Sequence, residues 1–81
     1  MPTDLLPRIT VNPEVMLGKP VIRGTRITVE ILLEKLAAGR TLEEILLDYP
    51  TLRREDVLAA LDYARGLVAI EEILPRVVAT G

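Results

Sequence analysis

The chain has 81 residues, 49% of them hydrophobic and nearly all of those aliphatic, and it carries a formal net charge of -2. It contains neither cysteine nor histidine, which excludes a disulfide, a thiolate metal site and the commonest general base. A chain of this length forms one small domain, and we expect no enzyme, no cofactor and no small-molecule substrate. Charges interrupt every apolar run, which indicates a soluble cytoplasmic protein without a signal peptide or a membrane span.

The aliphatic content is high for so short a chain. Because large exposed apolar patches are rare on monomeric proteins, this excess predicts a second buried surface, most simply a homodimer interface. The alternative is a well-filled monomer core with scattered exposed leucines.

The beginning of the chain predicts a flexible arm over residues 1–7, followed by β structure. Arg8-Ile9-Thr10-Val11 alternates as a short strand does. Residues 12–16 open with the turn signal Asn-Pro and favour one brief helical turn capped by the asparagine. Residues 21–27 place Val-Ile and Arg-Ile pairs on either side of Arg23-Gly24-Thr25. Because the glycine can take positive φ, this spacing predicts a tight hairpin.

Two helices follow, each with its own start and stop signals. Thr28 can cap the first, whose apolar residues at 29, 32, 33 and 36 share a face, and Gly39 ends it. Thr41 and Glu44 form a capping box for the second helix. Tyr49-Pro50 ends that helix, because a residue before proline is disfavoured in the helical region. The predicted buried stripe of the second helix consists of Leu42, Ile45 and Leu46.

The third helix is predicted to begin at Thr51 or Arg53. Gly66 either breaks it or lets it run on to Leu74, where Pro75 closes the run. Its predicted apolar face comprises Val57, Leu58, Leu61 and Ala64. Its predicted outward positions are Glu55, Asp56, Ala59 and Asp62.

These elements predict a mainly α fold, a three-helix, helix-turn-helix-like bundle with a short N-terminal β-strand and hairpin. We expect a single domain over residues 8–74 and a short tail over residues 75–81.

Double-stranded DNA is one conceivable partner, because charge is unevenly distributed along the chain. Residues 1–28 hold four bases and two acids, whereas the remainder holds ten acids and six bases. The outward carboxylates of the third helix would be repelled by DNA, so the basic N-terminal part is the better contact. The candidate DNA-binding residues are Lys19, Arg23, Arg26, Arg53 and Arg54. Of these, Lys19 has a secondary role, as does Arg8.

The stretch GKPVIRGTRI, residues 18–27, resembles the DUF433 family of small prokaryotic proteins. The similarity continues through LAAG at 36–39, TLEEI at 41–45, DYP at 48–50 and AALDYA at 59–64. One departure is Leu17-Gly18, where the family often shows two glycines. The resemblance implies a homeodomain-like or winged-helix-like fold. It also implies an antitoxin of the VapB type, one that neutralises a PIN-like ribonuclease toxin.

An antitoxin would dimerise, bind operator DNA and mask the nuclease, and an acidic surface suits a basic RNA-binding face. The candidate toxin-binding segment is an amphipathic stretch containing Leu67, Val68, Ile70, Ile73 and Leu74. The same stretch could instead pack on its own core or at a dimer interface. Two other functions stay open: a DNA-binding regulator acting alone, and a structural dimerisation module that pairs through free strand edges.

Overall fold

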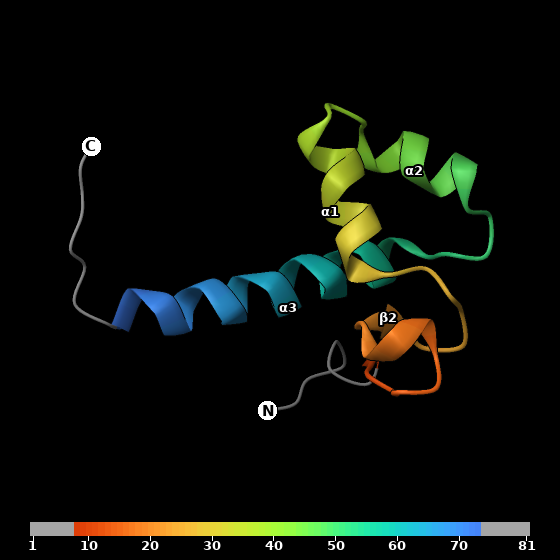
Figure 1. Ribbon diagram of the computed structural model, residues 1–81. Coiled ribbons are helices and arrows are strands. Elements are labelled where there is room, and N and C mark those ends of the chain that lie inside the picture. The colour runs from red at the N-terminus through yellow and green to blue at the C-terminus, as the bar shows by residue number, and fades with distance from the viewer. Residues whose placement is uncertain (1–7, 74–81) are drawn as a thin grey trace.

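The computed structural model describes the backbone of residues 8–73 and the side chains of residues 8–70. The predicted arm over 1–7, the side chain of Ile73, residue Leu74 and the predicted tail lie outside the described residues. The elements, in chain order, are β1 (Ile9–Thr10), the turn η2 (Met16–Gly18), β2 (Val21–Ile22), α1 (Val29–Ala37), α2 (Leu42–Asp48) and α3 (Arg54–Ile73). Three helices and a small antiparallel β element confirm the predicted fold class (Figure 1).

The β element differs in detail from the predicted hairpin. β2 pairs with β1, in the register Ile9↔Ile22 and Thr10↔Val21. The turn after β2 does form, because the Thr25 amide donates to the Ile22 carbonyl at 3.0 Å and Gly24 has φ +82°. Its return arm makes only the single bridge Val21↔Thr28. The edges expected to be free for a second chain are thus partly used within the molecule.

The ends of α1 and α2 confirm the predicted capping residues. The Thr28 hydroxyl accepts from the Ile31 amide at 3.0 Å, and Thr41 forms the reciprocal capping box with Glu44. At the end of α1, the Gly39 amide donates to the Leu36 carbonyl and the Arg40 amide to the Lys35 carbonyl, a Schellman motif. Gly39 has φ +97°, a conformation that favours glycine. The short connection between α1 and α2 is therefore fixed by local chemistry.

α3 is one continuous helix that passes through Gly66 without a break. It runs between α1 and β2, and its C-terminal half extends past both (Figure 1). The predicted orientation of its first half is wrong in part. Val57 is buried and Glu55 is exposed, as predicted. Asp56 and Ala59, expected outside, are 7% and 2% exposed, whereas Leu58 and Leu61 are 40% and 41% exposed. Small Ala59 and Ala60 let the helix lie close against the core, and the leucines are turned outward.

The core lies where the first half of α3 meets α1, α2 and the strands. Its fully buried members are Ile22, Val29, Leu32, Ile45, Leu52, Val57 and Ala60. The two aromatic residues of the chain, Tyr49 and Tyr63, pack against this cluster. Among the described residues, no helix is long and apolar enough to span a membrane.

Candidate partner-binding surfaces

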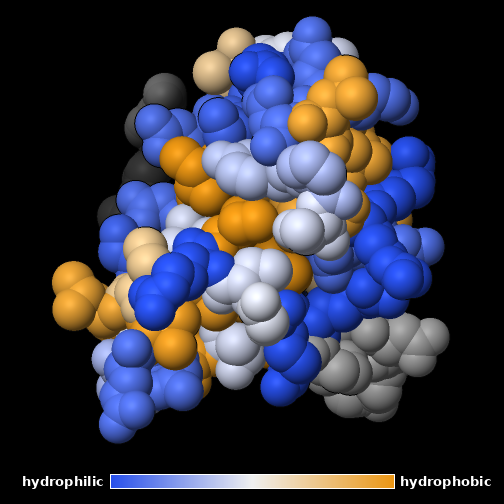
Figure 2. Space-filling model, turned by 90° about the vertical axis from the view of Figure 1, so that its right-hand side faces the viewer, coloured by the Kyte–Doolittle hydropathy of each residue, from blue (hydrophilic) through white to orange (hydrophobic). Residues whose placement is uncertain are grey.

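A hollow of about 610 Å³ opens beside η2. It is walled by η2, the segment that leads into α1, the first two turns of α1 and the residue that ends α2. Its lining residues are Met16, Leu17, Lys19, Arg26, Ile27, Thr28, Glu30, Ile31, Glu34 and Tyr49. Figure 2 shows the side of the molecule where the segment before α1 and the end of α2 come together, with hydrophobic side chains gathered at its centre among hydrophilic ones.

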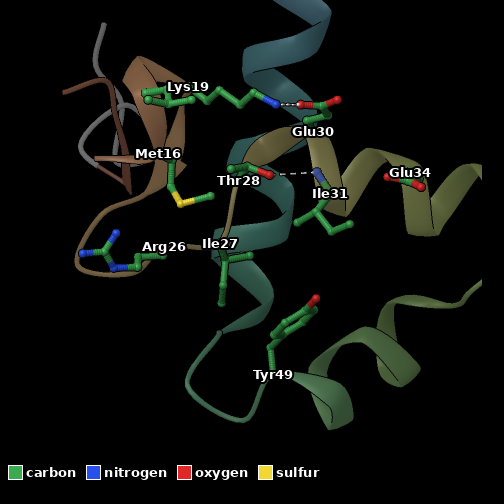
Figure 3. Close-up of a pocket in the computed structure, with 10 residues that line it drawn as sticks. Met16, Lys19, Arg26, Ile27, Thr28, Glu30, Ile31, Glu34 and Tyr49 are labelled. Atoms are coloured by element: carbon green, nitrogen blue, oxygen red, sulfur yellow. Dashed lines mark hydrogen bonds and ion pairs between the residues drawn. The ribbon is translucent and has the colours of Figure 1, made fainter. Parts of the chain in front are cut away.

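The floor of the hollow is apolar. Met16, Ile27, Ile31 and the ring of Tyr49 surround the same space (Figure 3). Ile27, Ile31 and Tyr49 are also packed against the core, so the floor is held in place by the fold. A preformed apolar floor with polar groups at its edge is the usual character of a binding site.

The turn η2 has an unusual backbone. Met16, Leu17 and Gly18 have φ values of +50°, +59° and +83°. For an L-residue other than glycine this left-handed conformation costs about 1–2 kcal/mol per residue. The turn projects Leu17, which is 93% exposed. Strained backbone that persists in this way is concentrated at binding sites.

The predicted turn capped by Asn12 does form, but it ends before Met16, which has positive φ. The Asn12 side chain accepts from the Glu14 amide at 2.9 Å, and the Val15 amide donates to the Asn12 carbonyl. The left-handed turn follows this first turn. The one sequence signal for it was Leu17-Gly18, at the place where the resembling family often has two glycines, the residue that takes positive φ most readily.

Charged groups stand at the edge of the hollow. Lys19 Nζ and Glu30 Oε1 form an ion pair at 2.8 Å (Figure 3). The hydrogen bond and charge of Lys19 hold the pKa of Glu30 below its ordinary value of 4.5. Arg26 and Glu34 are also exposed, and neither side chain forms an ion pair within the described part of the chain. The edge thus holds one neutralised pair and two separate opposite charges.

The start of α3 carries a buried carboxylate. Asp56 Oδ2 accepts from the Arg53 amide at 2.8 Å, and its Oδ1 lies 3.0 Å from Arg8 Nη1. This contact ties the residue before β1 to the first turn of α3. The three carboxylates of α3 that were expected to repel DNA are Glu55, Asp56 and Asp62, and the contact with Arg8 removes Asp56 from the exposed surface. Asp62, the third, is paired with Arg65 at 3.1 Å.

The structure brings only two of the candidate DNA-binding residues to the hollow, Lys19 and Arg26. Lys19 is engaged with Glu30. Arg23 is exposed on the turn after β2, and its amide donates to the Arg8 carbonyl at 2.7 Å. Arg53 and Arg54 are exposed at the start of α3 and do not line the hollow.

A second apolar surface lies on the outer half of α3. Ala60, Tyr63, Leu67 and Ile70 follow one another at helical spacing and share one face. Ala60 is 1% exposed in the core, whereas Leu67 and Ile70 are 54% and 60% exposed. The face that packs on the core therefore continues beyond it without cover from any described residue. Val68, on another side of the helix, is 51% exposed.

Comparison with known proteins adds a family to this description. Residues 9–64 match DUF433, a family of proteins of unknown function. The chain belongs to the DUF433 family. A crystal structure of a DUF433 member from Anabaena variabilis is similar to it with a TM-score of 0.70 and 30% identity, covering 89% of this chain and 83% of that one.

The chain is also similar to part of a longer protein. The uncharacterised protein y4eO of Sinorhizobium fredii is 38% identical over 58 residues, which are 72% of this chain and 26% of y4eO. The matched region thus spans about a quarter of the length of this curated relative.

Proposed function

We propose that this DUF433 protein is the antitoxin of a type II toxin–antitoxin pair and neutralises a PIN-like ribonuclease. The observation that carries the proposal is the uncovered continuation of the core-facing side of α3, with Leu67 and Ile70 more than half exposed. An amphipathic helix that extends beyond its own domain is a common ligand for an apolar groove. The acidic remainder of the chain complements the basic RNA-binding face of a nuclease.

The proposal predicts that a PIN-like nuclease is encoded beside the gene of this chain, and the test uses that nuclease. The purified protein should inhibit RNA cleavage by that nuclease, and Leu67→Gln with Ile70→Gln should weaken inhibition at least about 100-fold, because two apolar anchors are lost. Leu47→Gln is the matched control, since Leu47 is 80% exposed on α2, away from this face. Inhibition by the double variant equal to that of the control would remove α3 from the toxin contact. Absence of any inhibition by the wild-type protein would refute the proposed function.

A DNA-binding regulator with a homeodomain-like arrangement of α2 and α3 is the second candidate. Burial of Asp56 favours it, because the exposed start of α3 then presents Arg53 and Arg54 with one carboxylate fewer. Binding to the upstream DNA of its own gene should weaken steeply with salt, by a log–log slope of about 0.9 per phosphate contacted. Arg53→Glu with Arg54→Glu should abolish binding measured by fluorescence anisotropy. A flat salt response would exclude this function.

A further inference from the structure

The face around the hollow carries a projection and a depression side by side. The projection is Leu17, 93% exposed at the tip of the left-handed turn. The depression is the apolar floor formed by Met16, Ile27, Ile31 and Tyr49 (Figure 3). A surface of this shape can fit a second copy of itself, because a twofold axis beside the projection places each Leu17 over the other copy's floor.

The charges of this face are also self-complementary. Arg26 and Glu34 lie on opposite sides of the hollow (Figure 3), and both are exposed. Neither has an ion-pair partner among the described side chains. A twofold axis makes every contact between two different residues occur twice, once in each direction across the interface. Opposite charges placed across a twofold axis therefore pair twice.

We propose that this face is the homodimer interface, with Leu17 of each copy seated in the hollow of the other and Arg26 paired with Glu34 of the partner subunit. The inference rests on the proposed function only in taking the antitoxin to be a dimer, and it involves neither nuclease nor DNA. It also gives the strained turn a role, since the turn holds Leu17 outward before association and so reduces the ordering required on binding.

The charge balance favours a second copy over other occupants. The edge of the hollow holds two cations, Lys19 and Arg26, and two anions, Glu30 and Glu34. Because these charges sum to zero, the edge has no net attraction for the phosphates of DNA or for the basic face of a nuclease. The rest of the chain holds ten acids and eight bases, so the remaining surface of one copy carries net negative charge and would repel that of another. This neutral face avoids that repulsion.

Sedimentation equilibrium on the isolated protein tests the proposal with single charge reversals. The wild-type protein should be a dimer at micromolar concentration. Arg26→Glu and Glu34→Arg should each be monomeric, because each places like charges opposite one another twice. An equimolar mixture of the two variants should form a heterodimer, since both cross-pairs are then attractive. The doubly reversed Arg26→Glu/Glu34→Arg protein should regain the homodimer.

Rescue on mixing separates a lost interface from a lost fold. Arg54→Glu is the matched control, since Arg54 is exposed on α3 and forms no ion pair within the described chain. It should leave the dimer unchanged. Leu17→Gly keeps a residue suited to positive φ and removes the projection, so it should weaken the dimer at least about 100-fold, because burial of two leucines is lost.

The proposal is overturned by a monomeric wild-type protein, by single reversals that stay dimeric, or by monomeric variants that fail to associate on mixing. The first of these outcomes would also remove the dimer from the proposed function. If the dimer responds to the variants as expected but the wild-type protein does not inhibit the nuclease, the antitoxin function is refuted and this interface stands. If the wild-type protein inhibits the nuclease but is a monomer, the interface is refuted and the antitoxin function stands.

Discussion

Asp56→Ala should be among the most destabilising single changes in this protein. The carboxylate is 90% shielded, accepts from the Arg53 amide at 2.8 Å and meets Arg8 at 3.0 Å. Hydrogen bonds to charged groups contribute about 1.5–3 kcal/mol each, so the loss of both should cost about 3–5 kcal/mol. A chain of this length has a total stability of about 4–12 kcal/mol. The urea midpoint followed by circular dichroism should therefore fall by at least about a quarter of its wild-type value.

Two further variants show whether this contact is responsible. Asp62→Ala removes an α3 carboxylate whose partner Arg65 is largely exposed, and it should cost about 0–0.5 kcal/mol. Arg8→Ala should cost less than Asp56→Ala, because it also removes the buried Arg8 Nε, which has no hydrogen-bond partner among the described residues. A double-mutant cycle between Arg8 and Asp56 should give a coupling of at least about 1 kcal/mol. A cost below about 1 kcal/mol for Asp56→Ala, or zero coupling, would refute the reasoning.

Three other changes test separate features of the fold. Gly39→Ala should destabilise the protein by about 1–2 kcal/mol, because φ is +97° at that residue. The same change at Gly66, inside α3, should stabilise it by about 0.5–1 kcal/mol, because a β-carbon there would meet no other described segment within 4 Å. Thermal unfolding that gave both changes the same sign would contradict this. The hydrogen bond from the Thr41 amide is the main reason that the pKa of Glu44 lies below its ordinary value of 4.5. The stabilising contribution of Glu44 is therefore present above pH 4.5 and is lost as the pH falls through the lower pKa of the folded state. Glu44→Gln should therefore lose less of its urea midpoint between pH 7 and pH 3 than the wild-type protein does, and an equal loss would exclude the assignment. In the monomeric Arg26→Glu background, Leu17→Gly should raise the free energy of unfolding by about 0.5–1 kcal/mol, because the strain relieved at positive φ exceeds the added backbone entropy of glycine in the unfolded chain. A lower stability in urea unfolding would show that the turn is unstrained.

Elements whose signals are local could be predicted from the sequence. Thr28, the capping box of Thr41 with Glu44, and Gly39 each act within a few residues, and their chemistry specifies the helix ends directly. Each of these signals was confirmed. The sequence left undecided whether the third helix breaks at Gly66, because one unfavourable residue had to be weighed against a long helical run. The helix continues through Gly66.

The orientation of α3 could not be predicted from hydrophobicity alone. A pattern of leucines favours turning Leu58 and Leu61 inward, but close packing of Ala59 and Ala60 and the contact of Asp56 with Arg8 determine the observed side. The Arg8–Asp56 contact joins residues 48 positions apart, which no local pattern can indicate. The hollow could not be predicted from a local pattern either. It is assembled from segments that lie apart in the chain, so Arg26, Glu34 and the projecting Leu17 become one surface only after folding.

The reach of α3 past the core predicts a gradient of amide protection along a single helix. Its 20 residues span about 30 Å, and among its described side chains those packed on the core all lie in the first half. The remaining turns are too few to be stable as an isolated helix in water, where about 12–15 residues are already marginal. Hydrogen exchange should therefore be slow near Val57 and Ala60 and become faster from Leu67 onward. A partner that covers Leu67 and Ile70 would slow exchange at amides it never touches, and this change would report its binding.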